Sequence, residues 1–123
     1  MIRTIGMDKV NKYLRTEFDK DSWNCFSLVK EFYPELDIDT EFKNLNGNKE
    51  QINDVIENRK DLIEEITKPV ENCLVLMNDY HIGIFYKGKI LHNDEPQTRY
   101  EPLHQLKYKY KNIRFFRVKD KDA

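Results

Sequence analysis

Three residues of this chain have the types and the spacing that nucleophilic acyl transfer requires. Cys25 opens an apolar helical pattern, and His81 and His92 lie 11 positions apart in a stretch that reads as a β-hairpin. A thiol, a base that accepts its proton and a group that orients the base form a minimal set for covalent attack on a carbonyl. We therefore take these three as the candidate catalytic residues.

The start of a predicted helix, where Cys25 lies, suits a reactive thiol. The cysteine shares one apolar face, at helical spacing, with Leu28, Val29 and Phe32. Asn24, a good N-cap residue, precedes it. In a first helical turn, free backbone N–H groups and the positive end of the helix dipole favour a thiolate and stabilise an oxyanion. The alternative is a buried core thiol, a common environment for free cysteine.

The two histidines share a sheet face if the turn of the hairpin has two residues. A turn at Lys87 and Gly88 pairs Gly83 with His92. His81 then becomes a diagonal neighbour of His92, about 7–8 Å away at the backbone, and Gly83 puts no side chain between the rings. A three-residue turn would shift the register by one and place the histidines on opposite faces.

Three further residues, Tyr13, His104 and Cys73, are of types that can take part in catalysis or binding. Tyr13, on a short first helix, is a candidate substrate-binding residue through its hydroxyl, with a core aromatic as the alternative. His104 lies outside any catalytic pattern, so we expect an ordinary surface or core histidine. Cys73 opens an apolar run with no base nearby in the sequence, which predicts a core thiol.

A metal site was also considered, because His81, His92 and Asp94 are possible ligands. The chain lacks a pair of closely spaced cysteines and an HExxH helix, the patterns typical of zinc sites. It also has no glycine-rich phosphate loop. The sequence therefore predicts neither a metal nor a cofactor.

The surrounding pattern predicts an α+β protein, with helices first and strands later. Helices are expected near residues 10–14, from Cys25 to about Phe32, and over residues 51–67 with a break near 58–61. Strands are expected at residues 73–77, 81–86, 89–92 and 112–118. The length of 123 residues predicts one domain, residues 1–123.

Composition limits the partners. The net charge of −1 gives no reason to expect nucleic acid or an anionic membrane surface. We interpret the basic stretch from Lys107 to Lys119 as a solvated strand edge, with a phosphate-contacting patch as the alternative. Two cysteines are too few for a disulfide framework and favour two free thiols, with one disulfide as the alternative. The N-terminus lacks a signal-peptide pattern, and no apolar run approaches the ~18 residues of a membrane span.

The chain resembles the NlpC-type cell-wall cysteine peptidases, which have a compact papain-like domain. The resemblance rests on residues 24–29 (Asn-Cys-Phe-Ser-Leu-Val), residues 81–85 (His-Ile-Gly-Ile-Phe) and His92. Residues 28–33, 69–77 and 115–117 are similar to the phage tail branch of that family. Two departures are Asn24 in place of the usual aspartate and the absence of a Gly-Gly stretch before the cysteine.

The resemblance implies a role for each residue. Cys25 would be the nucleophile, His81 the general base, His92 the group that orients it, and Tyr13 a substrate contact. The helices, with the nucleophile at a helix start, would pack on an antiparallel sheet. The implied activity is hydrolysis of amide bonds in peptidoglycan stem peptides without metal or cofactor.

The phage tail branch also implies where the protein acts. It would be made in the bacterial cytoplasm, reside in the virion tail beside other tail-tip proteins, and open the wall locally during infection. One alternative is a catalytically weak or inactive structural or assembly protein of the tail tip, with an interface formed by Tyr100, Tyr108 and Tyr110. Another is acyl transfer to a lipid or a small amine.

Overall fold

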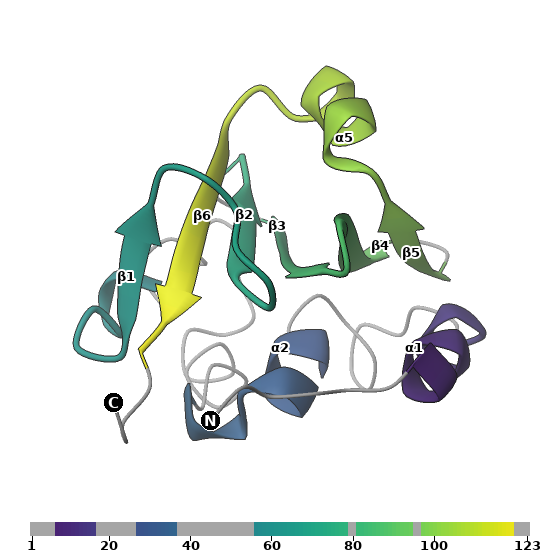
Figure 1. The fold of residues 1–123 in the computed structure, drawn as a ribbon, viewed down its shortest axis with the longest axis horizontal. Coiled ribbons are helices and arrows are strands. Elements are labelled where there is room, and N and C mark those ends of the chain that lie inside the picture. Colours follow the sequence, from purple (N-terminus) through teal and green to yellow (C-terminus); the bar gives the residue numbers. More distant parts are fainter. Residues whose placement is uncertain (1–6, 17–26, 37–55, 79–80, 95–96, 120–123) are drawn as a thin grey trace.

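A six-stranded antiparallel sheet forms the centre of the protein (Figure 1). The computed structural model describes residues 7–16, 27–36, 56–78, 81–94 and 97–119. The strand order is β1-β6-β2-β3-β4-β5. The strands are β1 (Ile63–Ile66), β2 (Leu74–Met77), β3 (His81–Tyr86), β4 (Lys89–Asp94), β5 (Gln97–Glu101) and β6 (Ile113–Val118).

Helices lie on both sides of this sheet (Figure 1). They are α1 (Met7–Leu14), α2 (Ser27–Phe32), the short 3₁₀ helix η1 (Pro34–Leu36) and α5 (Leu103–Lys109). The prediction of an α+β protein is confirmed. No helix among the described residues is long and apolar enough to cross a membrane.

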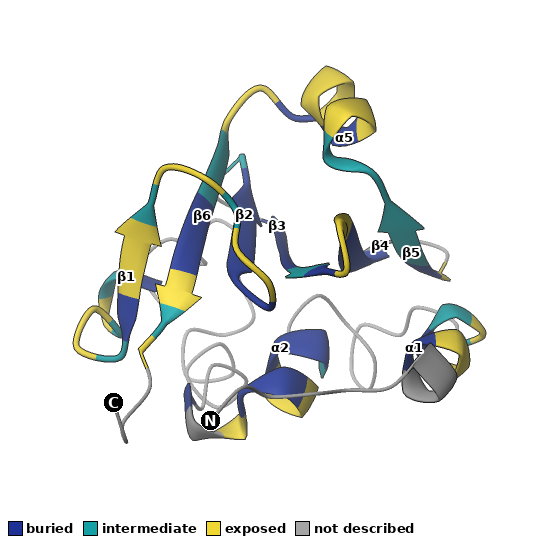
Figure 2. Ribbon diagram, viewed as in Figure 1, coloured by how far each residue is buried: buried dark blue, intermediate teal, exposed yellow. Residues whose placement is uncertain are grey.

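Two apolar clusters fill the space on the two faces of the sheet. The helix-side cluster joins α1, α2 and η1 to one face and includes Val10, Leu28, Leu36, Leu74 and Ile82. The α5-side cluster lies on the other face and includes Cys73, Val75, Met77, Ile90 and Leu106. All four residues of β2 are buried because alternate side chains enter opposite clusters. Figure 2 shows this buried centre with exposed residues on β1 and on the outer side of α5.

The hairpin of β3 and β4 has the predicted register. Gly83 pairs with His92, and Tyr86 pairs with Lys89. The turn residues Lys87 and Gly88 both have positive φ, 47° and 86°, as a two-residue turn that matches strand twist requires. Lysine is an unusual residue at such a position, yet the turn has two residues and the histidines share one face.

The helix predicted over residues 51–67 is wrong at its C-terminal end. Residues 56–57 are helical, but Ile63–Ile66 form the edge strand β1, paired with β6 from Ile63↔Val118 to Ile66↔Phe115. Pairing with a distant strand outweighs the helical spacing of the isoleucines, which are also good strand formers. Residues 51–55 lie outside the described residues.

The basic stretch near the C-terminus also differs from the prediction. Lys107 and Lys109 belong to α5, which was not predicted, while Arg114 and Arg117 lie on β6. Because β6 lies between β1 and β2, it is not a strand edge. Its arginines are accommodated by glutamates of β1: Arg114 binds Glu65, and Arg117 binds Glu64.

Candidate active site

His81 and His92 form a direct hydrogen bond. His81 Nε2 lies 2.8 Å from His92 Nδ1, and the rings meet edge to face with centroids 5.0 Å apart. Both residues are buried, with exposed fractions of 5% and 0%. The strands β3 and β4 position them, because Gly83↔His92 pairing puts His81 diagonally across from His92. The sequence prediction of neighbouring rings on one face is confirmed.

Gly83 provides the room that this contact needs. A Cβ atom at this position would lie 2.9 Å from His92 Cβ and 2.8 Å from the Leu91 carbonyl oxygen. Distances of that size do not occur for real Cβ atoms, so any other residue would displace β4. The glycine is therefore required by the close approach of the two strands beside the histidines.

Glu101 extends the histidine pair by one more side chain. His92 Nε2 lies 3.0 Å from Glu101 Oε2, and the glutamate side chain is 29% exposed. Strand β5 positions it, since Ile90 pairs with Glu101 and His92 pairs with Arg99. We call His81, His92 and Glu101 the histidine cluster. The sequence reasoning missed Glu101 because it did not predict β5; the alternation Thr98-Arg99-Tyr100-Glu101 is the signal that would have indicated a strand.

Tyr110, which follows α5, covers His81. Its ring stacks on the imidazole with centroids 5.8 Å apart and an interplanar angle of 14°. Tyr110 is 4% exposed. Tyr100 is half-buried, and the Tyr100 hydroxyl donates a hydrogen bond to the Tyr86 carbonyl oxygen at 2.6 Å. Of the three tyrosines expected to form an exposed interface, only Tyr108 is exposed, at 93%. That part of the prediction is wrong for Tyr110.

Cys25 lies outside the described residues, so its distance to His81 stays a prediction. Of the helix predicted from Cys25 to about Phe32, the structure describes α2, Ser27–Phe32, in which Leu28, Val29 and Phe32 are buried as expected. These residues pack in the helix-side cluster with Ile82 and Ile84. Because side chains alternate along β3, His81 projects from the opposite face of the strand that it begins. His81 thus lies on the same face as Tyr110, opposite to the face on which α2 packs.

The remaining predicted residues are placed away from the histidine cluster. Tyr13 is 5% exposed in the helix-side cluster, where burial and the neighbouring Glu31 carboxylate raise its pKa to about 12. Cys73 is a free, buried thiol, as predicted, and burial raises its pKa to about 11. His104 is exposed on α5. The described residues contain no group of three His, Cys, Asp or Glu side chains able to hold a metal ion.

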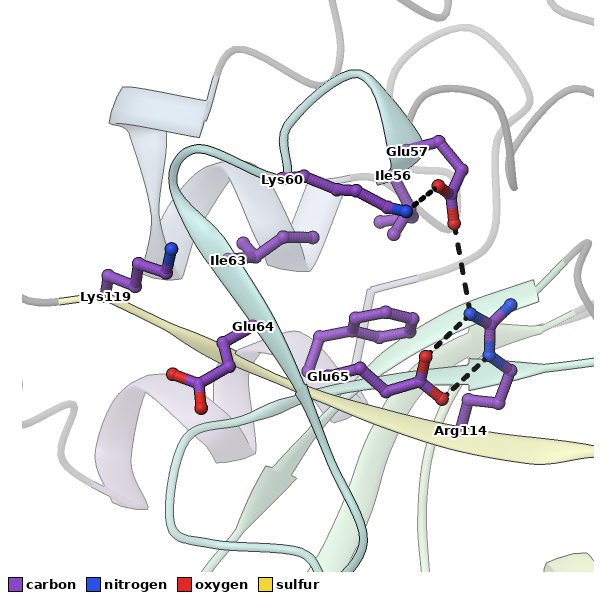
Figure 3. A pocket seen from close by; sticks show the side chains of 9 residues that line it. Ile56, Glu57, Lys60, Ile63, Glu64, Glu65, Arg114 and Lys119 are labelled. Atoms are coloured by element: carbon purple, nitrogen blue, oxygen red, sulfur yellow. Dashed lines mark hydrogen bonds and ion pairs between the residues drawn. The ribbon is translucent and has the colours of Figure 1, made fainter.

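A surface hollow of about 240 Å³ lies at the other end of the sheet (Figure 3). We call it the charged hollow; it is lined by Ile56, Glu57, Lys60, Ile63, Glu64, Glu65, Arg114, Phe116 and Lys119. Its charges pair with one another: Arg114 lies 2.9 Å from Glu65, and Lys60 lies 2.6 Å from Glu57. The hollow contains neither a nucleophile nor a histidine, which makes the histidine cluster the better candidate for chemistry.

Comparison of the chain with family models, with curated proteins and with solved structures found no match.

Proposed function

We propose that this protein is an NlpC-type, papain-like cysteine peptidase that hydrolyses amide bonds in peptidoglycan stem peptides. The observation that carries the proposal is the 2.8 Å contact between His81 Nε2 and His92 Nδ1 on one sheet face. A base held by a second buried ring is the arrangement that activates a thiol nucleophile. Cys25, at the start of the α2 segment, is the nucleophile in this proposal.

The reaction proceeds in two steps. His81 accepts the Cys25 proton, and the thiolate attacks the carbonyl carbon to give a tetrahedral oxyanion. The oxyanion collapses, the C–N bond breaks, and the leaving amine takes the proton from His81. In the second step His81 deprotonates water, which attacks the thioester and releases the acid and the Cys25 thiol. His92 keeps the His81 ring in its reactive orientation throughout.

Digestion of purified peptidoglycan tests this activity. We expect the wild-type chain to release stem-peptide fragments that mass spectrometry detects, and Cys25→Ala and His81→Ala to release none. His104→Ala is the matched control, because it removes an exposed histidine that lies on α5 rather than in the cluster. Equal release by the wild type and Cys25→Ala would refute the enzymatic proposal.

The proposed setting is a bacteriophage tail that opens the cell wall locally during infection. The support is the similarity of residues 28–33, 69–77 and 115–117 to the phage tail branch of the family. Antibodies raised against the chain should label the tail tip of intact virions in electron microscopy. Labelling confined to the host cell would contradict this location.

A second candidate is a structural protein of the tail tip in which the catalytic residues no longer react. The exposed ring of Tyr108 on α5 favours it, because a solvent-facing aromatic is common in protein interfaces. Thiol alkylation distinguishes the two. In a peptidase, Cys25 should react with iodoacetamide at neutral pH, whereas Cys73, with its pKa raised to about 11, should react only after unfolding. Equally slow labelling of both cysteines would favour the structural role.

A further inference from the structure

We propose that Glu101 is a positioning residue that fixes which nitrogen carries the proton in both His81 and His92. This role in catalysis rests on the proposed function, whereas the proton assignment itself depends only on the geometry of the histidine cluster.

The assignment begins at the carboxylate. An ionised glutamate only accepts hydrogen bonds, so His92 Nε2, 3.0 Å from Glu101 Oε2, carries a proton and donates it. A neutral imidazole has one protonated nitrogen, which leaves a lone pair on His92 Nδ1. His81 Nε2 lies 2.8 Å from that atom and therefore donates to it. The lone pair of neutral His81 is consequently on Nδ1, the nitrogen that acts as the base.

The groups around the cluster orient the Glu101 carboxylate. Arg99 Nη1 lies 4.0 Å from Glu101 Oε1, so the two carboxylate oxygens are directed to different partners. Among the described residues, the charged or titratable groups that face the two rings include the rings themselves, Glu101 and Arg99 of β5, and Tyr110 stacked on His81. Lys109 lies over the Tyr110 ring, 5.5 Å from its centroid. Among these, Glu101 is the anion within hydrogen-bond distance of His92.

The same arrangement supports the reaction after proton transfer. When His81 accepts the proton of a thiol, it becomes an imidazolium with N–H groups on both sides. Its Nε2–H still donates to His92, whose Nε2–H donates to the carboxylate, so the positive charge is stabilised through two hydrogen bonds. If His92 instead carried its proton on Nδ1, two N–H groups would face each other across the contact with His81 Nε2. His81 would then have to carry its proton on Nδ1, so it would present a proton rather than a lone pair to the thiol.

Nitrogen-15 NMR of the imidazole rings tests the assignment without any need for activity. The chain has only three histidines, and a His104→Gln variant identifies the third. At about pH 8, above the usual histidine pKa of about 6.5, wild-type His81 and His92 should both show a protonated Nε2 and an unprotonated Nδ1. In Glu101→Ala, the nitrogen-15 chemical shifts of His92 should move toward those of the Nδ1–H form. The chemical shifts of the His81 nitrogens should change with them, because the two rings share a hydrogen bond.

Two further variants make the result decisive. Glu101→Gln has nearly the same shape, retains the fold and should give an intermediate shift, while Glu64→Gln, another strand glutamate paired with arginine, should give none. A protonated Nδ1 on wild-type His92 would overturn the proposal. Unchanged ring nitrogens in both Glu101 variants would overturn it as well.

Kinetics test the catalytic part. With peptidoglycan fragments as substrate, Glu101→Gln should lower kcat by on the order of tenfold to a hundredfold and leave KM unchanged, because fewer molecules hold His81 as the base. Glu64→Gln should retain wild-type kcat. An unchanged kcat in Glu101→Gln would overturn the positioning role, whereas absence of activity in the wild type would refute the proposed function and leave the NMR result to decide the proton assignment.

Discussion

The histidine cluster and the charged hollow are two polar regions at opposite ends of one sheet, and they differ in exposure. In the cluster, His81 and His92 are 5% and 0% exposed, and their ring nitrogens bond to each other. In the hollow, the Glu65 side chain is 51% exposed while it binds Arg114 (Figure 3). Both regions rely on strand register, but only the histidine cluster contains a buried side-chain hydrogen bond, the one between its two rings.

This difference determines what each region can do. Exposed ion pairs exchange with water and add little to stability, so their geometry is loosely fixed. Buried polar groups lose much more when a partner is removed, because water cannot replace it. The histidine cluster is therefore able to hold a base in one orientation, whereas the charged hollow pairs Arg114 of the interior strand β6 with exposed glutamates.

Removal of the His92 ring should have the largest effect on stability. His92→Ala leaves a cavity and takes the acceptor from the buried Nε2–H of His81, which together should lower the free energy of unfolding by about 2–4 kcal/mol. Chemical denaturation measures this. His104→Ala, the same change on the exposed face of α5, should shift stability by no more than about 0.5 kcal/mol. Equal losses in the two variants would remove the distinction between buried and exposed polar groups.

A methyl group between the two strands should have the next largest effect. In Gly83→Ala, the new Cβ meets His92 Cβ and the Leu91 carbonyl, and the forced shift should cost about 1–3 kcal/mol. It should also break the contact between His81 and His92, which ring NMR would detect. Gly88→Ala is the control: it strains a positive φ but meets no atom within 4 Å, so the ring contact should survive.

A better turn residue should strengthen the hairpin. Lys87 has φ 47°, which asparagine tolerates better than lysine. Lys87→Asn should raise the free energy of unfolding by about 0.5–1 kcal/mol and leave the ring NMR signals of the histidines unchanged. Lys89→Asn, just beyond the turn on β4, is the comparison and should not stabilise the protein. A loss of stability in Lys87→Asn would show that the lysine side chain contributes more than its backbone strain costs.

The smallest effect is expected in the charged hollow. A double-mutant cycle of Glu65→Gln and Arg114→Gln should give a coupling of about 0.2–1 kcal/mol at neutral pH and less in high salt. Arg114 lowers the pKa of Glu65 below its ordinary 4.5. The folded pKa is thus lower than the unfolded one, so the coupling is present above pH 4.5 and is lost as the pH falls through the folded value. A large coupling insensitive to salt would contradict this description.

Local sequence patterns were sufficient for the part of the site that lies within one hairpin. Alternation along residues 81–92 and the Lys87-Gly88 turn predicted both strands, their register and the shared face of the histidines. The buried strand β2 and the interior strand β6 were likewise predicted from their apolar composition. For the hairpin and β2 the side-chain pattern and the final environment agree over a few neighbouring residues, whereas for β6 the strand was predicted but its interior place in the sheet was not.

Contacts between distant segments were not predictable in the same way. Ile63–Ile66 has apolar residues at helical spacing, and only its meeting with β6, about 50 positions away, makes it a strand. Tyr110 covers His81 because α5 returns over the sheet. These outcomes depend on the free energy gained when elements distant in the sequence pack together, and a short stretch of sequence does not predict that packing.

The sequence by itself determined the chemical types of the site and the hairpin that brings His81 to His92, because a two-residue turn and a side-chain period of two fix which residues face each other. The tertiary structure alone decided that Glu101 stands behind His92 and that both rings are buried. The physical reason is that the pairing of β5 with β4 places the Glu101 carboxylate beside the His92 ring. The packing of α5 and Tyr110 against the same face of the sheet then encloses the two rings.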